Sequence, residues 1–241
     1  PVGSGFTATV GARVRQDDML AMWPSVYPGD SVLDIFTYAG APGAYSLNLG
    51  AGAGLTYTNP NGFNASINYV SANADNGSPS YTFAGHGPAD RGGIMTQAAA
   101  ETFTAQVGYA AKNWGAAVAY TYGQHTPFSG TPLAKDWAGN VATNTNSVGL
   151  SAYWQPETSG WVPSISTGWG YTSYTNNIND INAQNPASQS WYVGLQWADA
   201  FVKGNTFGMA LGEPTFLTTS ATSGTYPNDA GYAWEWWYKF Q

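Results

Sequence analysis

Few side chains in this sequence are of the types that carry out catalysis or bind metals. Cysteine is absent, and the two histidines, His86 and His125, lie far apart in segments without regular alternation. Asp17 and Asp18 form an acidic pair, but the regularly spaced oxygen ligands of a calcium loop do not accompany them. No nucleophile elbow, phosphate loop or zinc-protease motif occurs. We therefore expect no enzymatic activity, no metal site and no cofactor.

The composition points to a membrane protein without membrane helices. Charged residues make up 9% of the chain, against roughly 25% in ordinary soluble domains. No run approaches the ~18 apolar residues of a spanning helix. Only helices and closed barrels satisfy every backbone group in lipid, which leaves a barrel as the membrane option. The net charge of −7 argues against nucleic-acid binding, which needs clustered Lys and Arg.

Ten segments alternate apolar with small or polar residues at a period of two, the pattern of half-buried strands. Segment 45–57 is the clearest, with Tyr, Leu and Ala alternating against Ser, Asn and Gly. The segments are 6–14, 45–57, 63–69, 103–109, 114–122, 148–154, 165–172, 190–197, 207–211 and 232–240. Most are close to the ~9–11 residues that a tilted strand needs to cross a bilayer.

Long and short connections between these segments alternate along the chain. The short ones, such as 58–62 and 112–114, have turn chemistry, whereas 15–43, 72–100 and 123–146 are long. Outer-membrane barrels have short periplasmic turns and longer extracellular loops. The sequence thus predicts an all-β, antiparallel up-and-down transmembrane β-barrel with both ends of this chain on the periplasmic side.

A soluble, secreted β-sandwich, such as a carbohydrate-binding module, is the alternative fold. It would also alternate apolar with polar residues. Its solvated face would normally carry Lys, Glu and Arg, whereas the polar faces here carry mainly Gly, Ser, Thr, Asn and Gln. Aromatic residues also recur near both ends of the apolar stripes, as interfacial girdles do. These features favour the barrel.

A porin needs a lining that sets which solutes enter rather than a catalytic group. Small inward residues, among them Gly108, Gly149, Gly168 and Gly194, are expected to keep a lumen open. The polar strand residues expected to line the pore are Arg13, Asn48, Asn64, Asn68, Gln106, Gln196, Glu235 and Lys239. Their neutral majority offers hydrogen bonds without fixed charge.

The first long connection, 15–43, combines charges with apolar residues such as Met19 and Trp23. It either folds into the pore as a constriction or packs on itself as an outer cap, and the sequence leaves both open. Its charged residues are Arg15, Asp17, Asp18, Asp30 and Asp34. Across all the long connections aspartates outnumber basic residues, which predicts a weak preference for cations.

Long stretches of the sequence resemble one protein family. They are "VRQDDMLAMWPSVYPGDSVLDIFTYAGAPGAYSLNLGAGAGLTY", "SVGLSAYWQPETSGWVPSISTGWGY" and "SQSWYVGLQWADAFVKGNTFGMALGEP". These resemble the cyanobacterial iron-uptake porins of the carbohydrate-selective porin superfamily. The resemblance covers most of the chain.

The resemblance implies an outer-membrane location, contact with lipid and assembly into homotrimers. Family members carry an N-terminal surface-layer-homology domain that ties them to the cell wall, and this domain is not in the sequence. They also continue with further strands, so residues 1–241 are expected to be part of a barrel of about 14–18 strands. The expected function is passive diffusion of small hydrophilic solutes, iron species by resemblance. A plugged structural barrel is the alternative within the membrane class.

Overall fold

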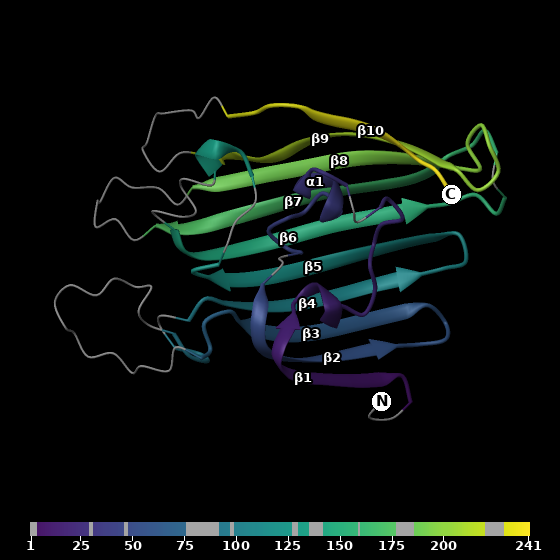
Figure 1. The fold of residues 1–241 in the computed structure, drawn as a ribbon. Coiled ribbons are helices and arrows are strands. Elements are labelled where there is room, and N and C mark those ends of the chain that lie inside the picture. Colours follow the sequence, from purple (N-terminus) through teal and green to yellow (C-terminus); the bar gives the residue numbers. More distant parts are fainter. Residues whose placement is uncertain are drawn as a thin grey trace.

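One antiparallel sheet dominates the computed structural model (Figure 1). The structure describes residues 4–28, 31–45, 48–75, 92–96, 99–126, 130–134, 142–158, 160–176, 186–219 and 229–241. The strands are β1 (Phe6–Arg15), β2 (Leu49–Thr58), β3 (Phe63–Ser71), β4 (Glu101–Ala110), β5 (Trp114–Gln124), β6 (Ala142–Trp154), β7 (Ser164–Asn176), β8 (Ala187–Ala198), β9 (Thr206–Thr219) and β10 (Ala233–Lys239).

The predicted all-β, up-and-down arrangement is confirmed. All ten expected segments contribute to strands, and the strands pair in sequence order from β1 to β10. Closure into a barrel is not observed, however. β1 pairs with β2 and β10 with β9, and the described residues leave the outer edges of both strands unpaired. The structure is therefore an open sheet of ten strands.

The connections alternate in length as predicted. Residues 59–62 and 111–113 join consecutive strands by short turns, whereas 16–48, 72–100 and 125–141 are long. In Figure 1 the turns gather at one end of the sheet, and the labels of both chain ends lie there too. The strands therefore have one plain end and one elaborated end.

Several strand boundaries differ from the prediction. β6, for example, begins at Ala142, six residues before the expected start at 148. β2 begins at Leu49, because Tyr45 is fully buried in the preceding segment rather than on a strand face. β9 continues to Thr219 through Pro214. Its pairing with β8 shifts register there, between Gln189 and Trp191. Such an irregularity tolerates a proline, which has no N–H to donate to the ladder.

A register shift also interrupts β1, between Gly11 and Val14. Cβ atoms built at Gly11 and Gly52 would approach the Val14 side chain, at 2.7 and 3.1 Å. Val14 therefore lies on the face of those glycines, although simple alternation places it on the apolar face. Arg13 falls within the shift and is exposed. The alternation that assigned Arg13 to the pore is broken at this position.

The hydrophobic core lies between the sheet and the segment that links β1 to β2. We call residues 16–45 the strap, of which 16–28 and 31–45 are described. It contains a 3-10 turn, η1 (Asp17–Met19), and a short helix, α1 (Asp34–Thr37). Most members of the core cluster are strap residues, namely Tyr27, Ile35, Phe36, Tyr38, Ala39, Ala41, Ala44 and Tyr45.

Candidate functional site

In a soluble protein the apolar face of a sheet is covered and the polar face is open. In this sheet the burial of the two faces is reversed. On β3 the side chain of Asn68 is 2% exposed, whereas that of the adjacent Ile67 is 50% exposed. On β5, Ala119 is 0% exposed and Val118 is 51% exposed. Small and polar residues thus lie on a covered face, and large apolar residues lie on an open one. We call these the polar face and the apolar face.

The strap covers the polar face and crosses it twice, in a first pass formed by residues 16–28 and a return pass formed by residues 31–45. The first pass starts over β3 and β4. The backbone N–H of Gln16 donates to Asn48 O at 3.0 Å, and Asn68 Nδ2 donates to Gln16 O at 3.2 Å. Further on, Gln106 makes two bonds with the backbone of Met22: its Nε2 donates to the carbonyl at 3.0 Å, and its Oε1 accepts from the N–H at 3.3 Å. Two residues predicted to line the pore, Asn68 and Gln106, therefore hold the strap.

A chain of buried hydrogen bonds joins the two passes of the strap by way of threonine side chains on β4 and β5. Gln16 Nε2 donates to Thr104 Oγ1 at 2.8 Å, and the hydroxyls of Thr104 and Thr121 are 2.8 Å apart. The Thr121 hydroxyl donates to Ala44 O at 2.7 Å, which leaves Thr104 as the donor to Thr121. Each hydroxyl thus has a donor role and an acceptor role, as buried polar groups require.

The first pass ends at Tyr27, beside β10. The Tyr27 hydroxyl donates to Glu235 Oε1 at 2.8 Å and accepts from Trp237 Nε1 at 2.9 Å. The backbone N–H of Tyr27 donates to the Ser166 hydroxyl on β7 at 3.1 Å. Burial, and then the bond to Glu235, raise the pKa of Tyr27, so its hydroxyl remains a neutral donor.

The return pass crosses β8 to β5 close to the strand backbones. Ser151 donates its hydroxyl proton to Ala39 O at 2.7 Å, and Ser190 donates to Gly40 O at 2.8 Å. Gly40 has a φ of +76°, which a residue with a side chain rarely adopts. The strap carbonyls thus find donors on the sheet instead of in water.

Glycines on the polar face make room for the strap rather than for an open lumen. A Cβ atom at Gly149 would be 2.8 and 2.9 Å from the methyl groups of Ala41 and Ala44. One at Gly194 would be 2.6 Å from the Tyr27 ring, and one at Gly168 would overlap the carbonyl of Ala39. The expectation that these glycines keep a lumen open next to the strands is therefore wrong for the described part of the chain.

The other residues predicted to line the pore occupy different settings. Asn48 is buried, and its Nδ2 donates to Val70 O at 3.0 Å. Asn64 is buried near a turn, and its Nδ2 donates to Gly62 O at 2.8 Å. Gln196 and Glu235 are half-buried, whereas Lys239 is exposed near the end of β10. These positions are spread over the sheet and form no single cluster.

The charged residues predicted in the first long connection lie on the strap or at its start. Arg15 pairs with Asp17 at 2.6 Å, and Asp18 and Asp34 are exposed. Burial, followed by the charges of Asp34 and Asp17, raises the pKa of Tyr38 to about 12. The structure therefore brings Asp17 and Asp34 near the same buried tyrosine. Asp30 lies outside the described residues.

Sequence reasoning missed most of the strap's contacts. The hydroxyls of Ser151, Ser166 and Ser190 bind the strap backbone, and that of Tyr192 lies 2.9 Å from the Ser25 hydroxyl. Their alternation on β6, β7 and β8 indicated the face that they share. Nothing in the local pattern indicated which backbone groups they would meet.

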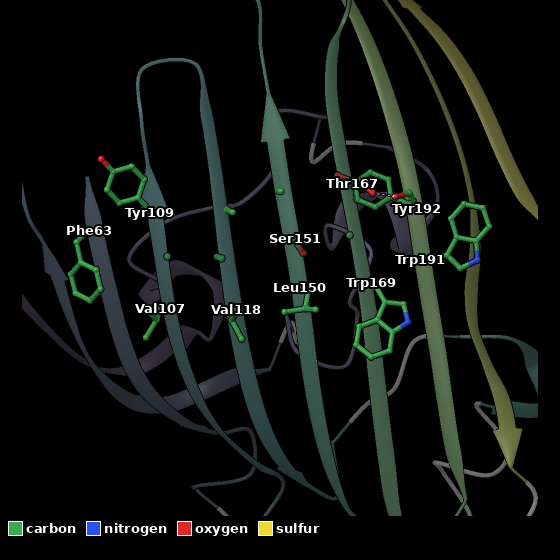
Figure 2. Close-up of a pocket in the computed structure, with 15 residues that line it drawn as sticks. Phe63, Val107, Tyr109, Val118, Leu150, Ser151, Thr167, Trp169, Trp191 and Tyr192 are labelled. Atoms are coloured by element: carbon green, nitrogen blue, oxygen red, sulfur yellow. Dashed lines mark hydrogen bonds between the residues drawn. The ribbon is translucent and has the colours of Figure 1, made fainter. Parts of the chain in front are cut away.

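The apolar face is hollowed between aromatic side chains. Figure 2 shows Phe63 and Tyr109 on one side of the hollow, Trp169 and Trp191 on the other, and aliphatic side chains between them. Its volume is about 670 Å³. The floor includes the residues Val107, Ala116, Val118, Leu150 and Ala152.

Aromatic residues also form two rows across the apolar face. By strand pairing, one row follows the end with the short turns and contains Phe6, Tyr57, Phe63, Tyr109, Trp114, Trp154, Trp197, Phe207 and Tyr238. The other lies toward the long connections and contains Tyr69, Phe103, Tyr122, Tyr120 and Tyr171. Trp169 and Trp191 pair in register with Leu150 and lie nearer the middle of the face. Aliphatic residues fill the band between the rows.

The described residues offer little for other chemistry. No three of their acidic or histidine side chains form a group that could hold a metal ion. His125 is exposed next to β5, and His86 lies outside the described residues. No helix among the described residues is long and apolar enough to cross a membrane.

No family model matches the chain, and no curated protein matches it.

Proposed function

We propose that this chain forms the wall of an outer-membrane porin that passively admits small hydrophilic solutes. The observation that carries the proposal is the inverted burial of the sheet. A soluble protein rarely leaves a contiguous apolar patch of more than a few hundred Å² in water. Here the apolar side chains of adjacent strands, such as Val107, Val118 and Leu150, form one bare surface. Lipid is the medium that suits it.

The aromatic rows also support a sheet whose apolar face contacts lipid. On β4 the rows are six residues apart, from Phe103 to Tyr109, and on β5 eight, from Trp114 to Tyr122. At ~3.4 Å per residue these spacings correspond to about 20–27 Å along the strands. A tilt of ~40° shortens them to about 15–21 Å along the membrane normal. The apolar band of outer-membrane barrels is ~25 Å tall. The aromatic rings widen the band at both edges.

The polar side of the protein determines which solutes pass. Most of its groups are neutral amides and hydroxyls that bind the strap. Glu235 accepts a hydrogen bond from Tyr27, and a further group of charges lies at the start of the strap and on its exposed surface. Arg15, Asp17, Asp18 and Asp34 give that surface a negative balance. A negative surface in a narrow passage enriches cations, although physiological salt screens it beyond ~8 Å. We therefore propose a weak cation preference, with iron species as the solute that the family resemblance implies.

Closure of the wall is part of the proposal. Unpaired strand edges cannot remain in lipid, because their backbone groups find no water there. β1 and β10 therefore pair with each other or with additional strands, which by family resemblance would bring the total to about 14–18. Assembly as a homotrimer, contact with outer-membrane lipid and attachment to the cell wall through a surface-layer-homology domain also follow from the resemblance alone.

The strap favours a second candidate, a structural barrel with a plugged lumen. It crosses the polar face twice, and its backbone is bound at β3, β4, β6, β7 and β8. The third candidate, a soluble β-sandwich, needs a second sheet on the apolar face. The described residues provide none, since all ten strands belong to one sheet.

One substitution tests whether the apolar face contacts lipid or water. Leu150 lies in the aliphatic band and is 45% exposed. At the bilayer midplane, Leu150→Arg should destabilise the protein by about 2–4 kcal/mol. On a solvated surface the same change should stay within about 0.5 kcal/mol. Thr158→Arg, at an exposed turn, is the matched control. Equal stability of the two variants in lipid vesicles would contradict the membrane proposal.

Conductance decides between the channel and the plugged barrel. Purified protein should produce ohmic channels in planar bilayers, and a salt gradient should give a reversal potential of the sign for cation preference. The preference should grow at low ionic strength, where screening is weaker. Stable insertion with no conductance would support the plugged barrel. An anion preference that persists at low salt would contradict control by the strap acids.

A further inference from the structure

The Tyr27 hydroxyl attaches the strap to β10, the last strand of the described sheet. This hydroxyl donates to Glu235 Oε1 at 2.8 Å and accepts from Trp237 Nε1 at 2.9 Å. Glu235 and Trp237 are two residues apart on β10, so they project from the same face. The contacts join residues 208 and 210 positions apart in the sequence. We call this arrangement the Tyr27 clamp.

The surroundings of Tyr27 fix its ring as well as its hydroxyl. Phe36, Tyr192 and Trp237 meet the ring edge-on at centroid distances of 6.2–6.3 Å. Gly194 provides the space, since a Cβ atom there would be 2.6 Å from the ring. Tyr27 is 4% exposed, so its hydroxyl has few alternative partners in water. Loss of the clamp therefore takes a partner from the Glu235 carboxylate and from the Trp237 N–H, both on half-buried side chains, which costs stability.

The clamp determines what kind of element the strap is. A gate leaves its closed position easily and has few contacts there. The strap instead makes many contacts. The Tyr27 ring packs against Gly194, two strap carbonyls accept hydrogen bonds from Ser151 and Ser190, and the Tyr27 hydroxyl is bound to β10. Elements that move in function come from the least stable parts of a protein, and these contacts place the strap among the more stable ones.

We propose that Tyr27 is a positioning residue that fixes the strap as a stationary wall on the polar face, so that it does not swing out as a gate. The consequence for transport rests on the proposed function, whereas the fixed position of the strap does not. Solutes then pass on the side of the strap that faces away from the sheet. Asp18 and Asp34, which are exposed on the strap, are met there by cations.

The fixed position is tested by hydrogen exchange on the folded protein, with peptides that cover residues 16–28. Tyr27→Phe keeps the ring and removes both hydroxyl contacts. It should raise the exchange rate of these peptides about tenfold, as expected for one or two lost hydrogen bonds. Glu235→Gln keeps an acceptor for the hydroxyl and should leave exchange near the wild-type rate, whereas Glu235→Leu should act like Tyr27→Phe.

Tyr153→Phe is the matched control, because Tyr153 packs over Gly115 and its hydroxyl has no hydrogen bond to the described part of the strap. Channel recordings then test the consequence. Tyr27→Phe should give noisier currents with frequent brief transitions and an unchanged reversal potential, and Tyr153→Phe should give steady currents. Unchanged exchange in Tyr27→Phe would overturn the clamp, and frequent voltage-independent closures in the wild type would overturn the stationary wall. Faster exchange with no wild-type conductance would uphold the clamp and refute the porin.

Discussion

Gly168→Ala is the sharpest test of the strap's fit on the sheet. Gly168 lies on the polar face of β7, directly beneath the return pass. A Cβ atom there would overlap the carbonyl oxygen of Ala39, 2.8 Å from its carbon and 2.9 Å from Ser151 Oγ. Carbon atoms prefer separations of about 3.5–4.0 Å, so the strap and β7 have to separate by roughly 1 Å. The hydrogen bond from Ser151 to Ala39 O, now 2.7 Å, then exceeds a bonding distance.

The magnitude follows from these two effects. Overpacking of a tight interface costs about 1–3 kcal/mol. A buried carbonyl that loses its donor costs about 1–3 kcal/mol more. Part of each cost is relieved by relaxation, so we expect the opening free energy of the strap to fall by about 2–5 kcal/mol. Since 1.4 kcal/mol is a factor of ten, strap amides should exchange from about 30-fold to several thousand-fold faster.

Hydrogen exchange of peptides covering 33–45 measures this opening, and Gly160→Ala is the control. A Cβ atom at Gly160 meets nothing within 4 Å, so that variant should stay within about 0.5 kcal/mol of the wild type. Peptides from β5 and β6 should remain protected in both variants. If Gly168→Ala exchanged like Gly160→Ala, the strap would not be seated on the glycines. If β7 lost protection and the strap did not, the strap would be the stiffer partner.

Three further outcomes are expected. Burial raises the pKa of Tyr45 to about 12 from an ordinary 10. Its stabilisation of about 2–3 kcal/mol is therefore present below pH 10 and lost as the pH rises from 10 to 12, seen as alkaline proteolysis within the strap. Replacing Asp17, Asp18 and Asp34 together by Asn should reduce the cation preference, measured as a smaller reversal potential at low salt, without loss of folding. Leu150→Arg should destabilise the protein in lipid vesicles by about 2–4 kcal/mol, measured by urea unfolding.

The sequence predicted the strands well because their signal is local. A period of two over 8–14 residues depends only on which face each side chain takes. The prediction failed where pairing with a neighbouring strand sets the start of a strand or its register. Tyr45 continues the alternation of segment 45–57, but β2 starts at Leu49, where pairing with Arg15 of β1 begins. In β1 the bulge before Val14 is likewise defined by the register against Gly50, which no local pattern reveals.

The candidate site was predictable by residue type and not by arrangement. Alternation placed Asn68, Gln106 and Glu235 on one face, and all three bind the strap or its tyrosine. The apolar content of segment 15–43 indicated that it had to be buried against something. The partners could not be inferred, because the contact of Tyr27 with Glu235 spans 208 positions. Glycine on a polar face also has two meanings, open space or close backbone approach, and only tertiary contacts separate them.

The strap and the apolar face together explain why this chain has so few charges. A polar strand face that meets water can use Lys and Glu. This one meets the strap, which leaves room for small residues such as Gly149 and for amides and hydroxyls that bond to it, such as Gln106 and Thr121. If the apolar face lies in lipid, as we propose, it also excludes basic residues, because each Arg or Lys there costs about 2–4 kcal/mol. Most charges of the described residues therefore lie in turns, at strand ends and on the strap. The acids inside β9 and β10 have partners, since Glu213 accepts a hydrogen bond from Trp191 Nε1 and Glu235 accepts one from the Tyr27 hydroxyl. Any selectivity of the protein then depends on the strap and the long connections.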